Sequence, residues 1–106
     1  MRITISHNRP KQEMKEAVER SIDQLFTGFN LGLIEFANQR KEWSGDRMTF
    51  SLTAKIGFLQ TPIQGWALVA DRDVTLDVDL GLLNKLIPEE SAKALLAQRA
   101  AGLLGK

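Results

Sequence analysis

Alternating apolar and polar residues mark several segments of the chain. Residues 2–6, 47–56 and 74–80 alternate with a period of two, and each segment predicts a strand with one buried and one solvated face. Residues 63–70 also have extended character, whereas residues 57–62 interrupt the pattern. The alternation therefore indicates an antiparallel sheet with a single apolar face.

Two other segments show the spacing of amphipathic helices. Over residues 11–26 the apolar positions recur every three to four residues, with charged residues on the opposite side. Pro10 suits the first turn of this helix, and Gly28 is suited to end it. A second helix is predicted over residues 88–104, where the apolar positions again form a stripe.

The remaining segments set the order of the elements. Residues 31–43 are extended but alternate poorly, which predicts a β-bulge or a late start of the strand. Residues 44–46 predict a tight turn, and residues 71–73 predict a short hairpin connection. The order is therefore β-α-β-β-β-β-α. We expect an α+β fold, in which a four- to five-stranded antiparallel sheet carries both helices on one face.

Composition narrows the class of protein. The 106 residues predict a single domain over residues 1–106. The chain has no cysteine and one histidine, which excludes disulfides, thiolate metal sites and cysteine nucleophiles. Fourteen basic against thirteen acidic residues leave a net charge of +1, which does not favour nucleic-acid binding. The sequence shows neither a signal-peptide pattern nor a membrane-spanning run, so we expect a cytoplasmic protein.

Few polar residues could carry chemistry. His7 lies between a strand and a helix, where a lone histidine is more often structural than a general base. Asp77 and Asp79 share one face of a strand and could bind a cation, although their alternation with core residues favours a solvated face. Phosphate-loop and nucleophile-elbow motifs do not occur. We predict no catalytic residue, no cofactor site and no metal site.

Large apolar side chains offer candidate contacts instead. Trp43 and Trp66 could pack under the helices or lie at an exposed rim, where they would mark a protein or ligand contact. The leucines of the last helix could dock on the sheet or lie at an interface. The candidate binding surface comprises Trp43, Trp66, His7, Leu95, Leu96 and Leu103.

A longer pattern covers residues 41–83. It comprises Trp43-Ser-Gly45-Asp46, Phe50, Gly65, the acidic hairpin Asp71-Arg-Asp73, and Val74-Thr-Leu76-Asp-Val78-Asp-Leu80-Gly81. With this pattern the chain resembles the polyhydroxyalkanoic acid system proteins, which are small bacterial proteins encoded near polyester-granule genes. The start of the chain, Ile-x-Ile-x-His7 with the helix after it, fits as well. The family pattern implies a shorter hairpin between Phe50 and Gly65 than this chain carries.

The resemblance implies a non-enzymatic accessory or binding protein of a polyhydroxyalkanoate system, and it brings no catalytic residue to this chain. We expect an amphipathic surface to contact the polyester granule or granule proteins. Three alternatives stay open. The protein could carry an apolar acyl or hydroxyacyl ligand in a cavity between sheet and helices. It could be an enzyme using His7 and aspartates, or a homo-oligomer whose function is assembly.

Overall fold

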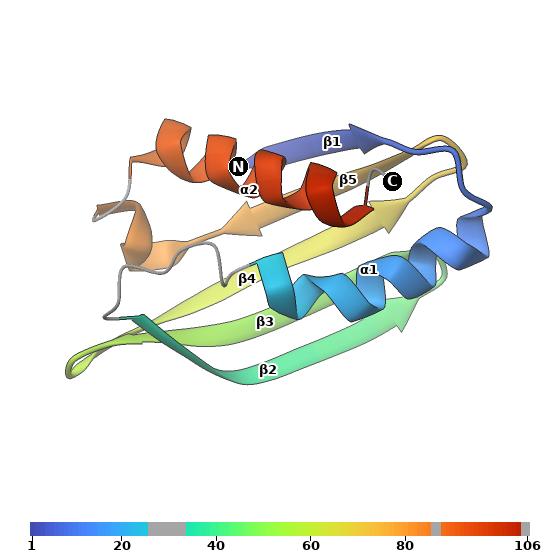
Figure 1. Ribbon diagram of the computed structural model, residues 1–106. Helices are drawn as coiled ribbons and strands as arrows, with labels where there is room; N and C mark the ends of the chain where they lie inside the picture. The colour runs from blue at the N-terminus through green and yellow to red at the C-terminus, as the bar shows by residue number, and fades with distance from the viewer. Residues whose placement is uncertain (26–33, 86–87, 105–106) are drawn as a thin grey trace.

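The computed structural model describes residues 1–25, 34–85 and 88–104. The elements are β1 (Arg2–Ser6), α1 (Lys11–Leu25), β2 (Ile34–Ser44), β3 (Arg47–Ile56), β4 (Leu59–Val69), β5 (Asp73–Asp79), the 3-10 helix η2 (Gly81–Lys85) and α2 (Glu89–Leu104). The five strands form one antiparallel sheet in the order β1-β5-β4-β3-β2, and both helices lie on the same face (Figure 1). The predicted α+β fold and element order are confirmed.

The core is a single layer between the sheet and the helices. The strands contribute the buried side chains of Ile3, Ile5, Met48, Phe50, Leu52, Ala54, Ile63, Ala67, Val69, Val74, Leu76 and Val78. The helices contribute Met14, Ala17, Val18, Ile22, Ala92, Leu96, Ala100 and Leu104. Because alternate residues of a strand point to the same side, the period-two pattern selects the face that the helices cover.

Residues 57–62 do not interrupt the sheet. β3 and β4 pair continuously from Arg47↔Leu68 to Ile56↔Leu59, and Gly57 with Phe58 forms the connecting turn. Gly57 has a φ of 61°, which fits the first central position of a type II′ hairpin turn. Pro62 is tolerated because it precedes Gln64, the first β4 residue that pairs with β5. The interpretation of these residues as a break is wrong, and they form one long hairpin.

The predicted β-bulge is present in β2. The register passes from Ala37↔Thr53 to Arg40↔Ser51, so two residues of β2 lie opposite one residue of β3. Asn38, one of the two, has a φ of 57° in the left-handed region. The bulge explains why the alternation of this segment is poor. The predicted end of the first helix at residues 26–28 lies outside the described residues, as does the start of the extended segment at residues 31–33.

The helices are shorter from end to end than the long strands, although they contain more residues. The 15 and 16 residues of α1 and α2 span about 22 to 24 Å at the helical rise. The 10 and 11 residues of β3 and β4 span about 33 to 37 Å at the strand rise. The β3–β4 hairpin therefore extends beyond α1, and its turn lies at one end of the molecule (Figure 1).

Gly65 provides a test of the packing between β4 and its neighbours. A Cβ atom at this position would overlap the backbone oxygen of Asp77 and would lie 2.7 Å from a ring carbon of Phe50. Because the Asp77 oxygen is backbone, the sheet must shift to admit any side chain. We expect Gly65→Ala to lower the free energy of unfolding by about 1–3 kcal/mol, measured by urea denaturation.

Gly102 is the matched control, because a Cβ there meets nothing within 4 Å. Gly102→Ala lies in α2 and should raise stability by up to about 1 kcal/mol through helix propensity. Equal effects of the two substitutions would contradict the packing described here.

Candidate functional site

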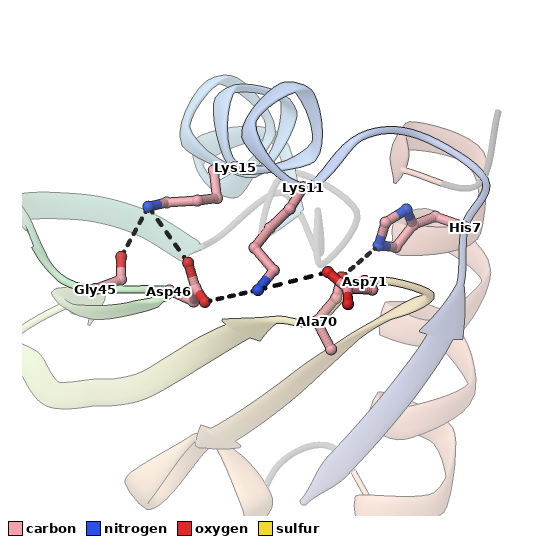
Figure 2. A network of polar contacts seen from close by, with 7 residues as sticks. All are labelled: His7, Lys11, Lys15, Gly45, Asp46, Ala70 and Asp71. Carbon is pink, nitrogen blue, oxygen red and sulfur yellow. Dashed lines mark hydrogen bonds and ion pairs between the residues drawn. The ribbon is translucent and has the colours of Figure 1, made fainter.

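His7 is buried, with 6% of its surface exposed, and both of its ring nitrogens bind backbone groups. The N–H of Arg9 donates to Nδ1 at 3.2 Å. The proton of the ring is therefore on Nε2, which donates to the carbonyl oxygen of Ala70 at 2.9 Å (Figure 2). His7 joins the start of α1 to the β4–β5 turn and is not part of a contact surface.

A network of charges lies at the same end of the molecule. Lys11 Nζ is 3.0 Å from Asp46 Oδ2 and 3.5 Å from Asp71 Oδ1. Lys15 Nζ donates to the carbonyl oxygen of Gly45 at 2.8 Å and lies 3.6 Å from Asp46 Oδ1. Two lysines of α1 thus hold the β2–β3 turn, and one of them also reaches the β4–β5 turn (Figure 2). We call these five residues the polar clamp.

The clamp perturbs the titration of its central pair. The hydrogen bond from Lys11, with its charge, holds the pKa of Asp46 below the ordinary value of 3.8. The same hydrogen bond and the charge of Asp46 raise the pKa of Lys11 above 10.5. Both groups are open to solvent, so the clamp positions the turns but is not a buried catalytic pair.

Trp43 lies on the helix face of β2, opposite the buried Met48. Its Nε1 donates to Glu19 Oε2 at 2.9 Å, and Lys15 Nζ lies 5.1 Å from the ring centroid. The half-buried indole therefore anchors α1 to the sheet. It borders a wide, open hollow whose other lining residues are Gln12, Lys15, Glu16, Glu19 and Arg20, all polar.

Trp66 lies on the opposite, solvated face of the sheet. The guanidinium carbons of Arg47 and Arg2 lie 4.6 and 5.4 Å from its ring centroid, distances at which cations interact with an indole. Arg2 Nε is also 3.1 Å from Asp77 Oδ2. The two tryptophans are therefore on different faces and do not form one surface.

The last helix uses its apolar stripe internally. Leu96 is 1% exposed and belongs to the core, so it cannot contact a partner directly. Leu95 and Leu103 are partly buried and pack against the same core while bordering an open hollow. The spacing of these leucines is therefore explained by docking of α2 on the sheet. It does not require an interface with a partner.

The acidic strand β5 does not assemble a metal site. Asp77 pairs with Arg2, and Asp79 accepts a hydrogen bond from the backbone N–H of Gly81 at 2.9 Å. Over residues 1–25, 34–85 and 88–104, no three histidine or carboxylate side chains gather so that they could hold an ion.

Exposed apolar side chains concentrate at the end opposite the polar clamp. Phe58 at the β3–β4 turn is 97% exposed, Leu59 beside it 56%, and Leu82 of η2 49%. We call these three residues the apolar end. Next to them lies a partly enclosed pocket of about 250 Å³, the end pocket, lined by Ala54, Ile56, Leu59, Gln60, Thr61, Leu82 and Lys85.

Local contacts hold η2 against the hairpin. The N–H of Leu82 donates to Thr61 Oγ1 at 2.9 Å. Gly81, with a φ of 57°, approaches β4 so closely that a Cβ would overlap Thr61 and the carbonyl oxygen of Pro62. The apolar end is therefore built on a fixed scaffold. A two-residue turn at Gly57-Phe58, followed by renewed alternation from Leu59, is the sequence signal that could have revealed it.

Fold and site together define a small α+β domain with an exposed apolar end. The family model described as "Putative polyhydroxyalkanoic acid system protein" matches residues 1–98. The chain belongs to this family, as the resemblance in its sequence indicates. Neither the curated proteins nor the solved structures include a match. Within the described part of the chain, no helix is long and apolar enough to cross a membrane.

The polar clamp predicts a pH dependence of stability. Because the folded-state pKa of Asp46 is lowered, its contribution is present above pH 3.8 and is lost as the pH falls through the folded value. Because the pKa of Lys11 is raised, its contribution is present below pH 10.5 and is lost as the pH rises further. Asp46→Asn should therefore destabilise the protein at neutral pH, and its effect should shrink as the pH falls below 3.8 and through the lowered pKa of Asp46.

Urea denaturation of both proteins across this pH range measures the effect. Glu42→Gln is the control, because Glu42 is exposed on β2 and makes no ion pair with the described residues. A constant difference between wild type and Asp46→Asn from neutral to acidic pH would contradict the role of the clamp.

Proposed function

We propose that the protein is a non-enzymatic accessory protein of a bacterial polyhydroxyalkanoate system, and that its apolar end binds the surface of cytoplasmic polyester granules. The observation that carries the proposal is the 97% exposure of Phe58 at the tip of a regular hairpin. Membership in the polyhydroxyalkanoic acid system family supports a polyester surface as the partner.

The energetics favour contact with an apolar solid. Removing a phenylalanine side chain from water contributes roughly 1.5–3 kcal/mol, and Leu59 and Leu82 extend the same surface. Scattered exposed leucines are normal on proteins, whereas a cluster with a protruding phenylalanine marks an interaction site. The hairpin is paired to its last residue before the turn, so Phe58 is presented without an ordering cost in a loop.

The other candidate contacts are occupied within the domain. Leu96 of α2 lies in the core, and Leu95 and Leu103 are partly buried against it. Trp43 is hydrogen-bonded to Glu19, and Trp66 has two arginines near its ring. The non-enzymatic part of the proposal is supported by His7, since both ring nitrogens already bind backbone groups. Among the residues that the structure describes, Phe58, Leu59 and Leu82 are the large apolar side chains most exposed to a partner.

Co-sedimentation with polyhydroxybutyrate beads tests the proposal. We expect Phe58→Ser to weaken binding roughly tenfold or more, because the buried area of the ring is lost. Leu68→Ser is the matched control: Leu68 is 37% exposed, but it lies on the solvated face of the sheet, opposite Arg47 and Thr75. This variant should bind as wild type does.

Two results would overturn granule binding. One is equal recovery of the wild-type protein on polyester beads and on uncharged agarose beads. The other is unchanged binding of Phe58→Ser, with circular dichroism showing that the variant is folded.

A further inference from the structure

We propose that the end pocket binds a single aliphatic chain with a carboxylate at one end, a medium-chain monocarboxylate, with the carboxylate at Lys85. The inference deepens the proposed function, since it names a ligand for the same end of the molecule. It rests on the pocket residues and not on Phe58, which does not line the pocket.

The walls of the end pocket are mostly apolar and favour an aliphatic ligand, with Gln60, Thr61 and Lys85 as the polar lining residues. Ala54, Ile56 and Leu59 come from the hairpin, and Leu82 closes the pocket from η2. The hydroxyl of Thr61 accepts the N–H of Leu82 at 2.9 Å and donates to the carbonyl oxygen of Pro62 at 3.5 Å, so its donor and one acceptor site are already used within the protein. A ligand inside this pocket gains from apolar contact, whereas a polar group there would lose its hydrogen bonds to water.

The volume limits the length of the chain. A dry apolar cavity of about 150 Å³ is large enough to bind benzene, with its six carbon atoms. The pocket of about 250 Å³ therefore has room for about eight chain atoms. A longer chain must extend into solvent, so affinity should stop rising at this length.

Lys85 supplies the charge at the rim. It is the last residue of η2, and within the described part of the chain it makes no ion pair or hydrogen bond. Aspartate and glutamate are missing from the lining residues given above. A long lysine side chain can lie along an apolar wall with its ammonium in water, where it would meet the carboxylate of a chain whose tail is buried.

A titration of the wild-type protein with straight-chain carboxylates tests the pocket. We would follow backbone amide shifts by NMR with butyrate, hexanoate, octanoate, decanoate and dodecanoate. The shifts should centre on Leu59, Thr61 and Leu82. Affinity should rise about fourfold with each added methylene up to about eight carbons and then stay constant.

Variants separate the apolar and charged contributions. Leu82→Trp fills the pocket from its partly exposed rim and should abolish octanoate binding. Lys85→Gln should weaken octanoate binding about two- to fivefold and leave octanol binding unchanged, because the contact is partly solvated. Lys93→Gln is the control, since Lys93 is an exposed lysine of α2 outside the pocket.

The results distinguish this inference from granule binding. Shifts that are absent or spread over the surface, affinity that rises steadily through dodecanoate, or full octanoate binding by Leu82→Trp would each overturn the pocket. Phe58→Ser should keep octanoate binding. Bead binding by Phe58→Ser therefore tests only the proposed function. The chain-length series on the wild-type protein tests only the pocket.

Discussion

The structure depends on a mismatch between the lengths of helices and strands. A strand advances more than twice as far per residue as a helix, so helices of 15 and 16 residues cannot cover a hairpin with strands of 10 and 11 residues. Alternation puts apolar side chains along the full length of that hairpin. The β3–β4 hairpin therefore extends beyond α1 (Figure 1), and Phe58 and Leu59 at its turn are exposed.

The two ends of the molecule differ in chemistry for this reason. At one end, α1 begins directly above the β2–β3 and β4–β5 turns, and the polar clamp and His7 bind these turns to the helix. At the other end, η2 is fixed to β4 through Thr61, and the apolar end and the end pocket lie beside it. One fixed end and one apolar end suit a protein that attaches to a surface.

Much of the fold could be predicted from the sequence, because one-faced strands and amphipathic helices have different periods. The order of elements, the bulge in β2 and the shared helix face all follow from apolar spacing. The hairpin at residues 57–62 is not apparent from the sequence, because glycine and proline usually interrupt strands. Pro62 fits within β4 because the pairing with β5 begins only at Gln64. The burial of His7 depends on tertiary contacts that local spacing does not encode.

The candidate site depends more than the fold does on tertiary contacts. Tryptophan and leucine residues are reasonable candidates for contact with a partner. In the structure, however, Trp43 is hydrogen-bonded, Trp66 lies against an arginine and Leu96 is buried in the core. Phe58 could have been recognised only together with its turn, because its exposure follows from the two-residue loop. The residues that carry the family resemblance are turn and core residues. They support the fold and do not indicate a reaction, and the family description refers to a system.

Hydroxyl-radical footprinting on polyhydroxybutyrate beads is the most direct test of whether the apolar end binds polyester, because it reports side-chain contact residue by residue. If the apolar end makes the contact, oxidation of Phe58, Leu59 and Leu82 should fall severalfold on the beads. Oxidation of Trp66, on the solvated face of the sheet, should stay the same. Protection of Trp66 or Leu103 with Phe58 unchanged would contradict it, because another surface would then make the contact.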